Sequence, residues 1–428
     1  MLNYEKKVLD NGLRVIVAPM ENTEAATISV LVGAGSRYET KKLNGISHFL
    51  EHLFFKGTKS RPKPGQVHKD LNKIGAVYDA FTSKEYTGFW VKSSVKDFDT
   101  GLDIVSDILL EPLFVKEEIE KEKGVILQEI SMYEDAPRRR IFDILENVLY
   151  GDQPVGWDIL GDKKTVGNIK RENILKYKND NYLSQNMVVV AAGNIDKKNT
   201  FRKIENIFKK IKEGLNRPAT RAKTSQTASQ IKIIKKDSDQ THFALAFRGY
   251  DMFNERRYTL ELLSIVLGGN MSSRLFTEIR EKLGLAYYVY SWENEHLDCG
   301  YLGMAAGIPH EKLEIVVRKV IDIIENIKQK GVSKKDLDDA KSFIRGQMAL
   351  RFETSDETAS YIAGQELFYK KILQPEEVLK RIEKVSQSDI LRIGREIFRP
   401  AKVNLAVIGQ QGDNKKDEEQ YKKILRTI

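Results

Sequence analysis

The sequence predicts an α+β protein of two similar domains, each a mostly antiparallel sheet with helices packed on one face. At 428 residues the chain is too long for one ordinary core, so we expect two domains or more. A helix pattern followed by an apolar run and a glycine occurs at residues 169–195 and again at 385–409. The two copies keep a constant offset of 216 residues, as from Ile174 to Ile390. Duplication is the simplest explanation of this order.

The most basic stretch of the chain separates the two copies. Residues 196–236 hold 13 Lys or Arg against 3 acids, an excess larger than the net charge of +9 of the whole chain. Gly214, Pro218 and the Ser/Thr/Gln-rich residues 224–230 are typical of a solvated linker. We predict a first domain at 1–213, a linker at 214–230 and a second domain at 231–428. No nucleic-acid-binding motif accompanies the charge, so we expect no nucleic-acid partner.

The first half begins with a predicted hairpin and a short helix. The turn signal Asp10-Asn11-Gly12 lies between two strand patterns. A helix can then start at a cap on Asn44 or Ser47 and end at Gly57. Its apolar positions are Phe49, Leu50, Leu53 and Phe54.

This short helix carries two imidazoles and a carboxylate, His48, Glu51 and His52. Helical residues four apart lie one above the other, so His48 and His52 can bind one ion. Glu51 lies beside His52, where its carboxylate can reach a water on that ion and act as a base. Imidazole and carboxylate ligands without thiolate suit zinc, which keeps an open position for water in hydrolytic sites.

A third ligand is available in the predicted helix at 117–129. Glu122 and Glu129 are two turns apart, roughly 10 Å along the axis, so both face the same way. We choose Glu129 as the ligand and place Glu122 behind it, although acidic runs are more often solvated helix faces. In the second copy Gln347 stands opposite Glu129 and Ala340 opposite Glu122. We therefore expect one zinc per chain.

The run from Gly45 to Thr58, followed by Glu129 in a Val-Ile-Leu-Gln-Glu context, resembles the insulinase/pitrilysin family of inverted (HxxEH) zinc metallopeptidases. It is most similar to the bacterial processing-peptidase-like branch, over essentially the whole chain. The resemblance implies that zinc binds His48, His52 and Glu129. It also implies that Glu51 activates the water and that Glu122 is a supporting carboxylate.

A second cluster, Arg280 and Tyr287, would be unremarkable without the resemblance. Taken alone, Arg280 lies on a charged helix end and Tyr287 begins an aromatic strand at 287–292, which favours a structural role. The pair resembles the family's Arg and Tyr that bind substrate and steady the developing oxyanion. We therefore include both among the catalytic residues.

Residues 79–87 are similar to the family's strand that pairs with extended substrate. Main-chain hydrogen bonds supply much of the affinity in such pairing. This chain has Asp79 where the family usually has Asn, and an ionised carboxylate cannot donate a hydrogen bond. The expected substrate-binding residues are Asp79, Ala80, Phe81 and Thr82.

The resemblance also implies an assembly and an activity. Four such domains close into a clamshell around a chamber, and this chain has two, so we expect a homodimer. Zinc of one subunit would face Arg280 and Tyr287 of the other. The expected function is a zinc-dependent endopeptidase acting on short or unfolded polypeptides. The alternatives are a non-catalytic or chaperone-like subunit of a processing-peptidase-type complex, and a heteromer in which a second gene product supplies the Arg/Tyr half.

Composition sets the expected location. Apolar runs such as 187–192 are far shorter than the roughly 20 residues that a bilayer requires, so we expect no membrane partner. Strand patterns begin close to Met1, which leaves no room for a signal or transit peptide. The single Cys299 excludes an internal disulfide and fits a reducing compartment. These features predict a cytoplasmic protein.

Overall fold

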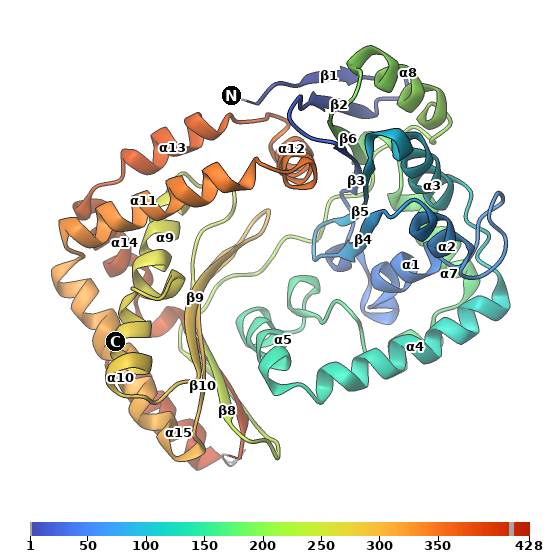
Figure 1. Ribbon diagram of the computed structural model, residues 1–428. Coiled ribbons are helices and arrows are strands. Elements are labelled where there is room, and N and C mark those ends of the chain that lie inside the picture. The colour runs from blue at the N-terminus through green and yellow to red at the C-terminus, as the bar shows by residue number, and fades with distance from the viewer. Residues whose placement is uncertain (1, 411–414) are drawn as a thin grey trace. The chain divides into compact units, whose positions relative to one another are not determined.

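The computed structural model describes residues 2–410 and 415–428, which form two compact units (Figure 1). Unit 1 is drawn from Met1–Ile130, Asp158–Thr220 and Gln347–Glu376. Unit 2 is drawn from Ser131–Trp157, Arg221–Gly346 and Glu377–Ile428. The division predicted along the chain, at 1–213, 214–230 and 231–428, stays a prediction about the duplicated halves. The compact units differ from it because each includes a segment of the other half.

Unit 1 contains a six-stranded sheet in the order β1-β2-β6-β3-β5-β4. Its strands are β1 (Glu5–Val8), β2 (Arg14–Pro19), β3 (Ala25–Val32), β4 (Val77–Thr82), β5 (Thr87–Ser94) and β6 (Met187–Gly193). Only the β2–β6 pair is parallel. Val8 pairs with Arg14 across the first turn, which confirms the predicted hairpin. The last strand, β4, lies at one edge.

Helices cover both faces of this sheet. On one face, apolar side chains of β2, β3 and β6 pack against α1, α3 and α8, with α2, α4, α6 and α7 around them. On the other face, Ala359 and Ile362 of α12 pack against Val188 and Val190. The bounds are α1 (Ile46–Phe54), α2 (Gln66–Lys73), α3 (Phe98–Leu110), α4 (Lys116–Glu134), α6 (Lys163–Asn168), α7 (Arg171–Asn181), α8 (Lys197–Phe208) and α12 (Ser355–Tyr369).

The expectation that helices cover one face is therefore incomplete. Residues of β6 from Met187 to Gly193 are buried without interruption, including those that point away from the main helical layer. A strand that is apolar on both sides must be covered on both sides. In unit 1 the helix α12, which comes from the second half of the chain, provides this second cover.

Unit 2 repeats the topology of unit 1 without its first strand. Its sheet order is β7-β11-β8-β10-β9, and only the β7–β11 pair is parallel. The strands are β7 (Gln230–Lys235), β8 (Thr241–Arg248), β9 (Tyr288–Glu295), β10 (Gly300–Ile308) and β11 (Val403–Gly409). The helix α14 and strand β11 follow α7 and β6 at the predicted offset. The structure thus confirms the α+β class and the duplication of the two halves.

The helices of unit 2 also lie on both sides of its sheet. Ile141, Ile144 and Leu145 of α5 pack against Ala244 and Ala406 on one face. On the other side, α14 contacts both α9 and α10 (Figure 1). The bounds are α5 (Pro137–Tyr150), α9 (Arg257–Ser264), α10 (Leu313–Lys330), α11 (Lys334–Arg351), α13 (Pro375–Glu383), α14 (Gln387–Ile397) and α15 (Lys415–Leu425), with π-helical turns η6 (Ile265–Gly269) and η7 (Phe276–Lys282). Among the described helices, none combines the length and apolar character that a membrane crossing requires.

Candidate metal centre

The helix α1 presents one apolar face to the core of unit 1 and its polar motif to the other side. Its buried apolar residues recur at the spacing of a single helix face. They are Ile46, Phe49, Leu50, Leu53 and Phe54. His48, Glu51 and His52 fall between these positions. The period of the sequence therefore fixes which way the motif points.

The start of α1 differs from the prediction. Neither Asn44 nor Ser47 is the cap, because Gly45 occupies that position with φ of 96°. Glycine has no side chain that could accept a hydrogen bond from the first N–H groups of the helix. The helix ends at Phe54, before the predicted Gly57. The buried carboxylate of Glu39, from the preceding loop, instead accepts hydrogen bonds from the N–H groups of Gly45 and Ser47, each at 2.8 Å.

Three ligand atoms converge beside α1. Nε2 of His48 and Nε2 of His52 lie 3.2 Å apart, and Oε2 of Glu129 lies 3.7 Å and 3.5 Å from them. Tetrahedral ligands bound to zinc at about 2.0–2.1 Å are separated by about 3.3 Å. The donor set and its spacing therefore fit zinc. Across residues 2–410 and 415–428, this is the only group of three His, Cys, Asp or Glu residues with ligand atoms close enough to hold a metal.

The carboxylate of Glu122 holds the second imidazole in place. Its Oε1 lies 2.8 Å from Nδ1 of His52, and its Oε2 lies 2.7 Å from Nζ of Lys56. A proton on Nδ1 of His52, donated to Glu122, leaves the lone pair of Nε2 for a metal. Glu122 is 3% exposed, unlike the solvated acids around it. The supporting role that the resemblance implies for Glu122 stays a prediction, and the contact with Lys56 was not predicted.

The pKa values of the two imidazoles are shifted in opposite directions. Burial and the charge of His52 lower the pKa of His48 to about 3, so His48 is neutral as a metal ligand must be. Burial also acts to lower the pKa of His52, but the hydrogen bond and charge of Glu122 outweigh it and raise that pKa. Burial raises the pKa of Glu129.

The proposed base, Glu51, is tied to the edge strand. Its Oε2 accepts a hydrogen bond of 2.6 Å from the hydroxyl of Thr82, the last residue of β4. Burial raises the pKa of Glu51, while this hydrogen bond lowers it. A raised pKa suits a carboxylate that must accept a proton and then return it. The sequence predicted Thr82 as part of the substrate strand but gave no sign of this contact.

The predicted substrate strand is an edge. In the described sheet β4 pairs only with β5, so its outer N–H and C=O groups face no other strand. Such an edge can accept an extended peptide. Asp79 is exposed on β4, and its Oδ1 accepts a hydrogen bond of 2.9 Å from the N–H of Ala80. The roles of Asp79, Ala80, Phe81 and Thr82 in binding stay predictions.

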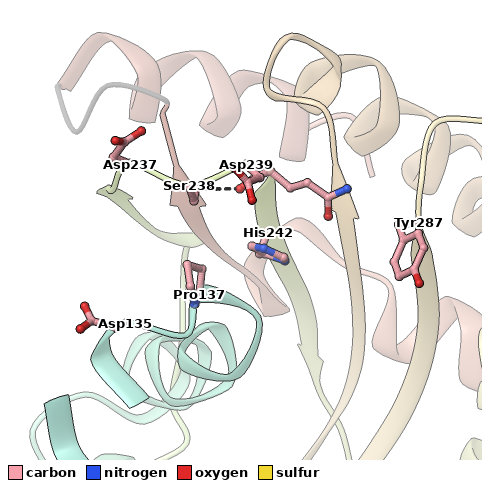
Figure 2. Close-up of a pocket in the computed structure, with 8 residues that line it drawn as sticks. Asp135, Pro137, Asp237, Ser238, Asp239, His242 and Tyr287 are labelled. Carbon is pink, nitrogen blue, oxygen red and sulfur yellow. Dashed lines mark hydrogen bonds between the residues drawn. The ribbon is translucent and has the colours of Figure 1, made fainter. Parts of the chain in front are cut away.

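Arg280 and Tyr287 lie together in unit 2. The guanidinium of Arg280, in η7, is 6.0 Å from the ring centroid of Tyr287, which immediately precedes the edge strand β9. The Tyr287 side chain is 70% exposed and lines a cavity of about 790 Å³ with Asp135, Asp237 and Asp239 (Figure 2). The candidate metal ligands belong to unit 1. That the pair faces a zinc site therefore stays a prediction.

Comparison with protein families shows what this chain is similar to. The family model described as insulinase (peptidase family M16) matches residues 14–163, which include His48, His52 and Glu129. A model described as the peptidase M16 inactive domain matches residues 168–343. The second description agrees with the absence of the zinc motif from the second copy in the sequence.

Relatives along the whole chain carry the same description. A Bacillus subtilis protein named an uncharacterized zinc protease is 32% identical over 388 residues, covering 91% of this chain and 94% of its own. A protein of the same description from Rickettsia felis is 34% identical over 408 residues, covering 95% and 98%.

Solved structures share the fold. The crystal structure of a protease from Helicobacter pylori has a TM-score of 0.90 and 24% identity, covering 96% of this chain and 100% of its own. The structure of a peptidase M16 inactive domain from Pseudomonas fluorescens has a TM-score of 0.88 and 19% identity, covering 97% and 99%. At these identities the likeness shows the fold alone.

Proposed function

Because the chain belongs to the insulinase family of peptidases, family M16, we propose that it is a zinc-dependent endopeptidase acting on short or unfolded polypeptides. The observation that carries this proposal is the convergence of three ligand atoms, from His48, His52 and Glu129, beside the carboxylate of Glu51. A scaffold without catalysis has no need of this arrangement.

Each residue of the centre has a role in amide hydrolysis. Zinc held by His48, His52 and Glu129 would supply Lewis-acid chemistry, making water more acidic and the scissile carbonyl more electrophilic. Glu51 takes the proton of the attacking water and returns it to the leaving amine. Thr82 holds Oε2 of Glu51 and leaves Oε1 for the proton. Glu122 and Lys56 hold the orientation of His52.

The edge strand β4 is the proposed binding site for the substrate backbone. A peptide added to the outer edge of β4 runs alongside Thr82, whose hydroxyl is hydrogen-bonded to the proposed base, Glu51. The same strand that pairs with the backbone thus places a peptide bond near Glu51. Proximity of this kind is a large part of the catalytic effect.

The proposal also includes a dimer with active sites built from both subunits. We expect a homodimer enclosing a chamber, in which Arg280 and Tyr287 of one subunit help to hold the tetrahedral oxygen at the zinc of the other. The exposed Tyr287 beside Arg280 supports this role, since both groups are accessible to a ligand. A cytoplasmic location is consistent with the single cysteine.

Zinc analysis combined with a peptide-library digest, with and without a chelator, tests the proposal. We expect one zinc per chain and cleavage of short peptides that stops on chelation and returns with added zinc. A chain that binds zinc but cleaves no peptide, or neither binds nor cleaves, would instead match the structural or chaperone-like alternative.

A further inference from the structure

Glu39 is a buried carboxylate of unit 1 that has no part in the proposed reaction. The residue is 6% exposed. Oε1 accepts a hydrogen bond from the N–H of Ser47, while Oε2 accepts from the N–H of Gly45 and, at 2.9 Å, from Nδ2 of Asn44. A carboxylate this deeply buried is costly unless its oxygens are hydrogen-bonded, and here both are. All three donors belong to the first turn of α1 or to the two residues before it.

These bonds replace a missing helix cap. The first N–H groups of a helix have no partner within the helix and are usually satisfied by a side chain at the cap. Gly45 cannot supply one, and a Cβ at this position would lie 2.5 Å from the carbonyl oxygen of Leu160, so no other residue fits. The carboxylate of Glu39, which precedes α1 in the chain, therefore takes the place of the cap side chain. Because α1 is only nine residues long, this contact constrains the whole helix that carries His48 and Glu51.

The same loop is anchored to the turn after the substrate strand. Arg37, two residues before Glu39, forms an ion pair with Glu85, and both are almost fully buried. The N–H of Arg37 also donates to the carbonyl of Lys84 at 2.8 Å, and that of Ser36 to Ser83 at 3.1 Å. Residues 83–86 connect β4 to β5. The segment 36–39 thus joins the end of β4 to the start of α1.

We propose that Glu39 is a positioning residue that sets α1 against β4, and thereby places Nε2 of His48 and the carboxylate of Glu51. The hydrogen bond from Thr82 to Glu51 links β4 to α1. A shift of α1 would therefore change both the positions of the histidine ligands and the position of the Glu51 carboxylate. The catalytic part of this inference rests on the proposed peptidase function, whereas its metal-binding part does not.

Glu39→Gln tests the proposal because an amide keeps one acceptor and presents an NH2 group to the other donors. The helix retains its apolar face and the contact between the hydroxyls of Ser47 and Tyr177 at 2.7 Å, so the variant keeps its main packing. The control is Glu366→Gln, which alters an equally buried carboxylate of unit 1, on α12, paired with Lys6. Zinc affinity is measured by chelator competition, kcat and KM at saturating zinc, and stability by thermal unfolding of the metal-free protein.

We expect Glu39→Gln to weaken zinc binding about 10-fold or more, and to lower kcat by up to about 100-fold with little change in KM. Glu366→Gln should lower the thermal midpoint but leave zinc affinity and kcat as in the wild type. Wild-type zinc affinity and kcat in Glu39→Gln would overturn the proposal. If that variant does not fold, Glu39→Asp keeps the carboxyl group but is one methylene shorter, and wild-type zinc affinity in Glu39→Asp would overturn the proposal equally. If the wild-type chain binds zinc but has no peptidase activity, the proposed function is wrong. Comparing the zinc affinities of the wild type and Glu39→Gln still tests the role of Glu39 in that case.

Discussion

Nδ1 of His52 lies 2.8 Å from Oε1 of Glu122, a carboxylate buried beneath the metal ligands and also paired with Lys56. This contact directs Nε2 of His52 to the other ligand atoms. Glu122→Gln removes the charge that holds the imidazole proton, so zinc binding should weaken by about 10- to 100-fold in a chelator competition. The control is Glu120→Gln, an exposed acid of the same helix that pairs with Lys123. Equal affinities in both variants would show that Glu122 plays no part.

Glu51→Gln should separate chemistry from metal binding. The amide cannot take a proton from water, so peptide hydrolysis should fall by about 10²- to 10⁴-fold. Zinc content should stay at the wild-type level, because the proposed ligands are His48, His52 and Glu129. Peptide-cleavage rates and zinc analysis on the same preparation check both statements. Substantial activity in this variant means that the base has been assigned to the wrong residue.

Thr82→Val should change the pH profile of the reaction. The hydroxyl of Thr82 lowers the pKa of Glu51, which burial raises, so removing it should raise that pKa further. The base works only when ionised, and the acidic limb of kcat/KM should therefore move to higher pH. The loss of rate should be larger at pH 6 than at pH 8. Thr82→Ser keeps the hydroxyl and should keep the wild-type profile, and coincident profiles for Val and Ser would refute the proposed contact.

Zinc affinity itself should depend on pH through His52. Burial lowers the pKa of this imidazole, but Glu122 and the other nearby carboxylates raise it above its ordinary value of about 6.5. A proton must leave His52 before Nε2 can bind zinc, so affinity should fall about tenfold per pH unit below that pKa. His48, with a pKa of about 3, adds no dependence near neutral pH. Isothermal titration between pH 5 and 8 measures the slope, and a flat profile would disagree with this assignment.

Mixing two inactive variants tests the composite site. After subunit exchange between Glu51→Gln and Arg280→Ala chains, half of the dimers carry one chain of each kind. One of the two sites in such a dimer has both Glu51 and Arg280 intact, so about a quarter of wild-type activity should return. Size measurement confirms that both variants still dimerise. No recovery from a mixture that exchanges subunits rules out the arrangement across the dimer.

Much of the metal centre could be predicted because helical periodicity controls it. The spacing of His48, Glu51 and His52, and the two turns between Glu122 and Glu129, place side chains on one face whatever surrounds the helix. The contacts of Glu39, Lys56 and Thr82 could not be predicted, because each depends on how a loop or a strand packs against α1. The uninterrupted apolar run in β6 was a usable sign that both faces of the sheet are buried. Which helix covers the second face is decided by tertiary packing, and α12 comes from residues more than 160 positions away.

Anomalous diffraction at the zinc edge, from crystals of the metal-loaded protein, tests the metal centre most directly. We predict one peak per chain, bonded to Nε2 of His48, Nε2 of His52 and the carboxylate of Glu129, with Glu51 close by but not bonded. A peak coordinated by other residues, or no peak from fully loaded protein, would contradict the zinc site and with it the proposed hydrolysis.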